Sequence, residues 1–128
     1  MVSDKYANEM IAEWVGFKER FTSGNLSCWW ELDGYPFAKC PDFINSETDC
    51  FRFIIPKLRE EGYGVDITVG RVGAFVNIWS LDEKHEDNSL MNTMPIGIGV
   101  RVSSAMCMAV LELMRKEWVD GISGLWYA

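Results

Sequence analysis

The chain has 128 residues, a net charge of −7 and a sequence pI near 4.6. This length is typical of one domain that buries a core without disulfides or metals. The excess of carboxylates disfavours binding to duplex nucleic acid, which needs a basic surface. No apolar run approaches the roughly 20 residues that span a bilayer, so we expect no membrane partner either.

Four cysteines and one histidine provide few potential ligands for a metal site. Cys28, Cys40, Cys50 and Cys107 form no Cys-x-x-Cys pair, and His85 is the only histidine. The polar N-terminus does not resemble a signal peptide, so we expect reduced thiols and a cytoplasmic location. The sequence therefore predicts no metal and no cofactor.

The first quarter of the chain reads as a helix followed by a hairpin. Ser3 can cap a helix that ends at Gly16. Residues 17–21 and 26–32 then predict a short hairpin, and residues 33–45 predict a loop.

A second helix is predicted from Ser46 to Gly62. Ser46 and Asp49 resemble a capping box, and apolar residues follow at helical spacing. Pro56 lies inside this helix, so we expect a bend rather than two helices. Gly62 suits the C-terminal cap.

In the next segment apolar and polar residues alternate, as they do in β-strands. Residues 63–69 and 74–81 flank the turn Gly70-Arg71-Val72-Gly73, which predicts a hairpin. Residues 95–102 predict another strand, with Gly97 and Gly99 on the side opposite to Ile96 and Ile98.

Ser103 or Ser104 is expected to cap the last helix, whose apolar stripe reaches Trp118. A tail over 119–128 carries three large apolar residues and is expected to dock on the same chain or on a partner. The predicted fold is one α+β domain over 1–128 with its core over 10–118. We expect a mostly antiparallel sheet of about four strands, flanked by helices in a sandwich-like arrangement.

Several segments together resemble a known family. They are Ile11-Ala12-Glu13-Trp14-Val15-Gly16-Phe17, Trp29-Trp30, Pro41-Asp42-Phe43-Ile44, Lys57-Leu58-Arg59-Glu60-Glu61-Gly62-Tyr63 and Ser103-Ser104-Ala105-Met106-Cys107-Met108-Ala109-Val110-Leu111. In this order they resemble small phage and prophage proteins that carry the phage ABA sandwich domain. The resemblance implies a sheet flanked by helices and a phage origin, and it implies no established reaction. Many small phage proteins of this kind counteract host defences, some by sequestering nucleotide-derived signals and some by blocking a host protein.

Two features predict contacts to a ligand. Adjacent Trp29 and Trp30 on a strand point to opposite faces, so one can stack on a base while the other packs in the core, although both can be core residues. Arg101 lies on the face that Gly97 and Gly99 leave bare, where a phosphate would have room. The alternative is an exposed strand face with Arg101 in water.

The remaining candidates are weaker. The turn around Arg71 can cradle a phosphate or be an ordinary hairpin turn, and Trp79 completes the predicted ligand set. The acidic run 82–87 around His85 fits a solvated loop better than a metal site. With one histidine in the chain, no nucleophile–base pair stands out, so we predict no catalytic residue.

The leading hypothesis is a phage-encoded anti-defence protein that sequesters a small nucleotide-derived immune signal without cleaving it. The ligand would be held by Trp29, Trp30, Arg71, Trp79 and Arg101, at a homo-oligomer interface built partly by the tail. The alternative is a protein–protein inhibitor of a host defence effector, and a hydrolase of the signal is a third reading. In each case the site of action would be the host cytoplasm.

Overall fold

The computed structural model describes residues 3–21, 28–81 and 95–127, with side chains as far as Trp118. Its elements follow along the chain in this order: α1 Asp4–Val15, β1 Lys18–Phe21, β2 Cys28–Leu32, β3 Tyr35–Phe37, α2 Glu47–Asp49, the π-helix η1 Cys50–Ile54, α3 Ile55–Glu60, β4 Tyr63–Val69, β5 Ala74–Ser80, β6 Ile96–Gly99 and α4 Val102–Tyr127. The α+β class is confirmed. The strands form two three-stranded antiparallel sheets, however, rather than one sheet of about four strands.

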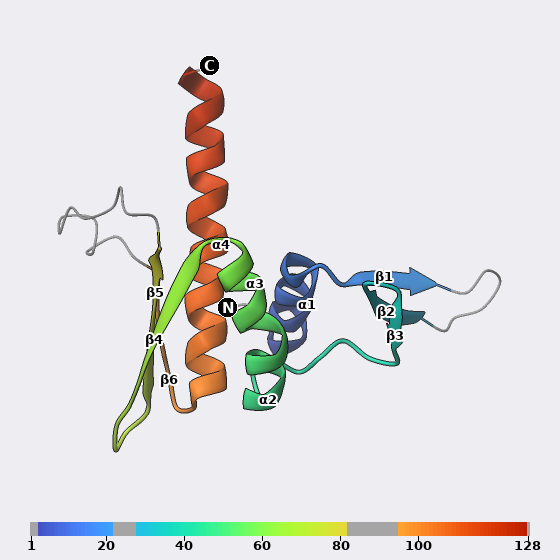
Figure 1. Cartoon of the computed structure of the whole chain (residues 1–128), viewed down its shortest axis with the longest axis horizontal. Helices are drawn as coiled ribbons and strands as arrows, with labels where there is room; N and C mark the ends of the chain where they lie inside the picture. The colour runs from blue at the N-terminus through green and yellow to red at the C-terminus, as the bar shows by residue number, and fades with distance from the viewer. Residues whose placement is uncertain (1–2, 22–27, 82–94, 128) are drawn as a thin grey trace.

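Helix α4 lies in the middle of the molecule (Figure 1). Sheet B, made of β4, β5 and β6, packs on one side of α4, and helices α1 and α3 lie on the other side. Sheet A, made of β1, β2 and β3, extends beyond α1. The predicted hairpin over residues 63–81 is confirmed as β4 and β5, whereas β3 lies in a segment that was expected to be a loop.

The first helix has the ends that the sequence predicts. The Ser3 hydroxyl accepts a hydrogen bond from the Tyr6 N–H at 3.2 Å. Gly16 ends the helix with φ of 123°, a backbone conformation that favours glycine.

The second helical segment runs without a break from Glu47 to Glu60, but its middle turn is a π-helix. The Ser46 hydroxyl accepts from the Asp49 N–H at 3.1 Å, so the predicted cap is confirmed. The N–H of Ile55 bonds to the carbonyl of Cys50, five residues back. Pro56 has no N–H to donate. The hydrogen bonds change from the π-helical to the α-helical spacing just before this proline.

Helix α4 differs from its prediction at both ends. It begins at Val102, so neither Ser103 nor Ser104 precedes it, and the Ser104 hydroxyl instead accepts from the Arg101 N–H at 3.2 Å. At the other end the helix continues to Tyr127, and its last turns project beyond the rest of the molecule (Figure 1). Residues 119–127 therefore prolong the helix rather than forming a separate tail.

Sheet B presses its inner face closely against α4. A Cβ atom on Gly97 would overlap the carbonyl oxygen of Ala105 and lie 2.5 Å from the nitrogen of Ala109. A Cβ on Gly99 would collide with the Ser104 hydroxyl. This corrects the expectation that Gly97 and Gly99 leave a bare face, because the backbone of α4 fills the space beside them.

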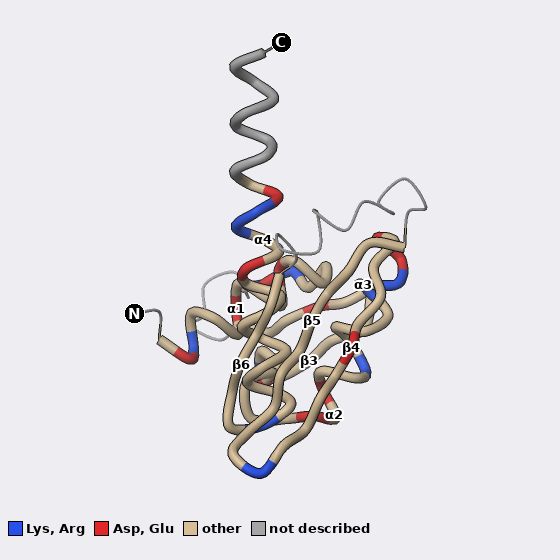
Figure 2. Tube along the Cα trace, turned by 90° about the vertical axis from the view of Figure 1, so that its left-hand side faces the viewer, with Lys and Arg blue, Asp and Glu red and all other residues tan. Residues whose placement is uncertain are grey.

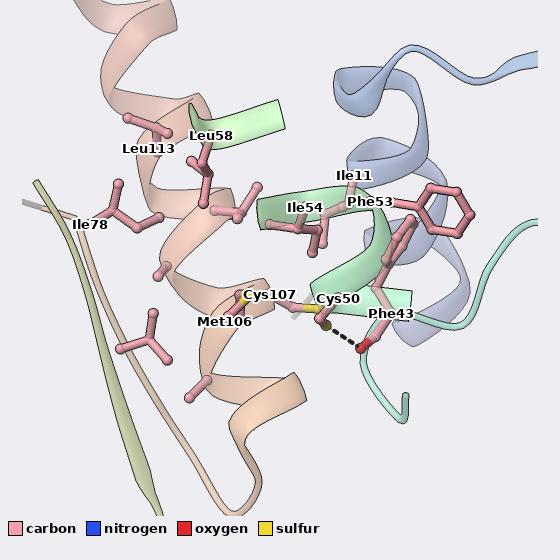
Figure 3. Packing of buried hydrophobic residues seen from close by; sticks show 14 of the residues in the cluster. Ile11, Phe43, Cys50, Phe53, Ile54, Leu58, Ile78, Met106, Cys107 and Leu113 are labelled. Atoms are coloured by element: carbon pink, nitrogen blue, oxygen red, sulfur yellow. Dashed lines mark hydrogen bonds between the residues drawn. The ribbon is translucent and has the colours of Figure 1, made fainter. Parts of the chain in front are cut away.

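The core lies where α4 meets α1, η1 and sheet B (Figure 3). Phe43, Ile54 and Met106 are among its fully buried side chains. The thiol of Cys50 donates to the carbonyl of Phe43 at 3.1 Å (Figure 3). All four cysteines are free, as predicted.

Buried polar groups tie the loop before α2 to helices on both sides. The Asn8 amide nitrogen on α1 donates to Asp42 at 2.9 Å, and its amide oxygen accepts from the Ile44 N–H at 3.1 Å. From α4, the Ser103 hydroxyl donates to the Ile44 carbonyl at 2.7 Å. The loop is therefore held in place by partners on both helices.

Candidate functional site

The five predicted ligand residues do not meet in one place. Trp29 and Trp30 belong to β2 in sheet A, where Trp30 is 4% exposed and part of the core and Trp29 is partly exposed. Trp79 lies on β5 in sheet B, Arg71 in the turn before β5, and Arg101 between β6 and α4. The alternative in which Trp30 is a core residue is therefore the one that the structure supports.

Three of the five residues lie on or beside sheet B, whose outer face is directed away from α4. Cross-strand pairing places Thr68, Phe75 and Ile98 in one row and Asp66, Asn77 and Ile96 in the next. Because paired residues share a face, these side chains lie together on the side opposite to the buried Val76 and Ile78. No element that the structure describes lies in front of this outer face (Figure 2).

Exposed apolar side chains lie on the outer face beside the polar Asp66, Thr68 and Asn77. Phe75 is 39% exposed, Ile96 42% and Ile98 71%, and the flanking Val100 is 85% exposed. Few acidic or basic residues interrupt the three strands in Figure 2. An exposed apolar surface of this kind marks a binding surface more often than a bare solvent face.

One end of the outer face carries positive charge beside a hollow. The hollow has a volume of about 500 Å³, and its lining includes Val72, Phe75, Ile98 and Val100. Arg71 is a neighbour of Val72 in the chain, and Arg101 follows Val100; both are exposed. Among the described residues neither guanidinium has an ion-pair partner. The structure thus brings these two predicted residues to the same end of the sheet.

Trp79 lies at the opposite end of β5, about 17 Å along the strand from Ala74 at the extended-chain rise. Its indole ring covers Gly64 of β4, because a Cβ on Gly64 would be 2.6 Å from the ring. Trp79 Nε1 and the neighbouring Asn77 Oδ1 are buried without a hydrogen-bond partner in the described part of the chain. The ring therefore covers the glycine of the neighbouring strand. Trp79 lies at the end of β5 away from Arg71 and Arg101.

A hollow larger than the one beside Phe75 lies elsewhere and was not anticipated from the sequence. It is a groove of about 760 Å³ between α1 and α4, and its apolar wall consists mainly of Met10, Met108, Leu111, Met114 and Trp118. The stripe of Leu111, Met114 and Trp118 was visible as a helical repeat. That repeat could not show that part of the stripe would remain uncovered.

A third hollow, of about 530 Å³, is polar and lies between α1 and sheet A. Cys28, Cys40 and several carboxylates line it. Burial and the nearby Glu9 and Glu19 raise the pKa of Cys40 to about 12. This thiol therefore stays protonated near neutral pH, which is unsuited to nucleophilic attack.

The described residues do not assemble a recognisable catalytic or metal centre. A hydrogen bond with Cys50, together with burial, raises the pKa of Cys107, so this thiol too stays protonated. No three His, Cys, Asp or Glu side chains within the described ranges come together as metal ligands. The acidic run around His85 lies outside these ranges. None of the described helices is long and apolar enough to cross a membrane.

Comparison with known proteins adds no relative. No family model matches the chain, and no significant match was found among curated proteins or solved structures. The resemblance to the phage ABA sandwich domain therefore stays a prediction.

Proposed function

We propose that this protein is a non-catalytic binding protein that covers a partner protein with the outer face of sheet B. The observation that supports this proposal is one uncovered sheet face on which Phe75, Ile96 and Ile98 are exposed together. Exposed phenylalanine and isoleucine side chains on this face depart from the usual pattern, in which the solvent side of an antiparallel sheet is polar.

The residues around the face indicate the chemistry of the partner. Protein interfaces combine an apolar centre with aromatic and arginine side chains, and Lys and Glu are depleted there. Phe75 and Ile98 supply such a centre, with Arg71 and Arg101 at its end. The complementary partner surface is an apolar patch bordered by carboxylates. In the phage context that the resemblance implies, this partner is a host defence protein in the host cytoplasm.

The change Ile98→Glu tests this proposal. We expect the variant to lose the partner that the unmodified protein captures from host lysate, because a carboxylate would be desolvated at the centre of the contact. Ile98 is 71% exposed, so the fold should tolerate the change. The matched control is Tyr35→Glu, at a residue that is 72% exposed on sheet A.

Quantitative mass spectrometry of the captured proteins gives the readout. A host protein that is retained by the unmodified chain and by Tyr35→Glu, and is lost with Ile98→Glu, supports the proposal. Equal retention by Ile98→Glu would show that the partner binds another surface.

A second candidate is the sequestration of a nucleotide-derived signal without cleavage. It is favoured by Arg71 and Arg101, which are chain neighbours of the hollow-lining Val72 and Val100, because an aromatic ring and two guanidinium groups can hold a base and a phosphate. The separation of Trp29, Trp30 and Trp79 from this hollow reduces the predicted set to Arg71 and Arg101, with Phe75 added.

A thermal-shift screen against cyclic nucleotides and ADP-ribose derivatives tests this candidate. A ligand at a hundredfold excess over Kd stabilises the fold by about 2.7 kcal/mol. We expect the double change Arg71→Ala with Arg101→Ala to abolish the shift. Arg59→Ala should preserve it, because Arg59 is exposed on α3, which lies on the other side of α4 from sheet B. Recovery of an altered nucleotide would instead indicate an enzyme, and a shift unchanged in the double variant would exclude this site.

A further inference from the structure

The groove between α1 and α4 has the size of a small-molecule site. Its volume of about 760 Å³ falls within the range of about 300–1,000 Å³ that ligand pockets occupy. The lining residues on α4 run from Ser104 to Trp118, about 21 Å at the helical rise per residue, so the groove is elongated. It is also separate from the outer face of sheet B, because sheet B packs on the other side of α4 from α1 (Figure 1).

Most of the groove lining is apolar. Ala7 on α1 and Cys107 on α4 are buried lining residues. Larger side chains come from both helices, and Met10, Met108 and Leu111 are among them. Methionine side chains are unbranched and adapt their shape to what they contact. The lining therefore suits a flexible apolar chain.

One ion pair interrupts the apolar lining. The Arg115 Nε and Nη2 groups both donate to the Oε2 atom of Glu112, at 3.1 Å and 2.9 Å. Within the described ranges, the second carboxylate oxygen of Glu112 and the Nη1 group of Arg115 make no hydrogen bond. The side chains of Glu112 and Arg115 are 45% and 66% exposed. The pair therefore offers an unused acceptor and an unused donor next to each other at the groove.

We propose that the groove binds a free single-chain amphiphile whose zwitterionic head is of the phosphocholine type. The apolar chain lies along Met10, Met108 and Leu111. The phosphate accepts hydrogen bonds from Nη1 of Arg115, and the quaternary ammonium faces the carboxylate of Glu112. Both halves of the head then meet an opposite charge.

A zwitterionic head fits these groups better than a head with a single charge. An anion at Arg115 would also approach Glu112, and a cation at Glu112 would also approach Arg115, so each would meet a like charge. Trp118 lies one helical turn beyond Arg115 and is exposed. Its indole face attracts a quaternary ammonium through a cation–π contact, which favours choline over a primary amine.

Methyl NMR of the full chain, labelled at the methionine methyl groups, tests the proposal. The probe is dodecylphosphocholine, kept below its micelle concentration. We expect saturable shifts of the Met10, Met108 and Met114 signals, because these side chains line the groove. The Met106 signal should stay in place and serves as the internal control, because Met106 is buried in the core and does not line the groove.

Probes with the same chain and half of the head test the role of the ion pair. Dodecyl phosphate and dodecyltrimethylammonium should each bind about tenfold more weakly than dodecylphosphocholine, because each lacks one charge-assisted contact. The change Glu112→Gln should weaken dodecylphosphocholine and strengthen dodecyl phosphate, since it removes the like charge beside the phosphate. A merely structural role of the ion pair would weaken both probes. Arg115→Gln should weaken both of the phosphate-bearing probes.

Variants of the apolar wall locate the chain of the amphiphile. Met108→Glu should abolish binding of dodecylphosphocholine, because it places a carboxylate in the path of the chain. The residue is exposed, and an unchanged far-UV spectrum would verify that the variant is folded. The matched control Ile98→Glu, on sheet B, should bind the probe as the unmodified protein does.

The outcomes separate this inference from the proposed function, which depends on another surface. Loss of binding in Met108→Glu, with Ile98→Glu unaffected, supports the inference even if no host partner is found. Equal affinities for the three heads would overturn it, as would the absence of methionine shifts below the micelle concentration. Binding to phosphatidylcholine vesicles without binding of the single-chain probe would also overturn it, because the ligand would then be a membrane surface.

Discussion

Replacing Gly97 by alanine should remove a substantial part of the stability of this protein. The new Cβ would overlap the Ala105 carbonyl oxygen and approach the Ala109 nitrogen, so β6 or α4 would have to move as a whole. Overpacking of a well-filled core costs about 3 kcal/mol, and a collision with helix backbone belongs at the upper end of that range. A domain of this kind has only about 5–15 kcal/mol in total. Urea unfolding followed by circular dichroism measures the loss.

The matched control is Gly70→Ala in the turn between β4 and β5. The nearest atom to its Cβ is the Gly73 carbonyl oxygen at 3.8 Å, an ordinary contact. We expect its free energy of unfolding to stay within about 0.5 kcal/mol of the parent protein. Equal stability of the two variants would show that β6, which carries Gly97, does not pack closely against α4.

Replacing Trp30 by alanine should destabilise the protein by about 3–5 kcal/mol. Its side chain is 4% exposed and belongs to the buried core, so the change leaves a large cavity beneath sheet A. Denaturant unfolding of the purified variant gives the value directly.

Trp29→Ala is the natural comparison, because the residue type and the strand are the same. Trp29 lies on the other face of β2 and is partly exposed, so we expect a loss of about 1 kcal/mol. A loss for Trp30→Ala no larger than that for Trp29→Ala would contradict the structural assignment. The hypothesis that both tryptophans hold a ligand would then regain support.

The outer face of sheet B shows why the site was only partly predictable. Arg71 and Arg101 were identified from their neighbours in sequence, and the structure places both at the same end of the sheet. The reason given for Arg101 was wrong, because the side bearing Gly97 and Gly99 is packed against α4. The exposed face is the one with Ile96 and Ile98, for which the sequence predicted no role.

The groove between α1 and α4 was even less predictable from the sequence, because it depends on tertiary contacts. A helical repeat shows which residues share a stripe, but it does not show how much of the stripe neighbouring elements cover. Helix α1 meets α4 along one flank only, so Met108 and Trp118 remain exposed.

The sequence by itself determined the local features of this protein. The cap at Ser3, the end of the helix at Gly16, the cap at Ser46 and the hairpin around residues 70–73 depend on hydrogen bonds and backbone angles among near neighbours. The tertiary structure decided which face of each element is buried, and it divided the strands into two sheets. The physical reason is that burial depends on packing partners distant in sequence: whether the glycine side of β6 is a pocket or a contact depends on where α4 lies.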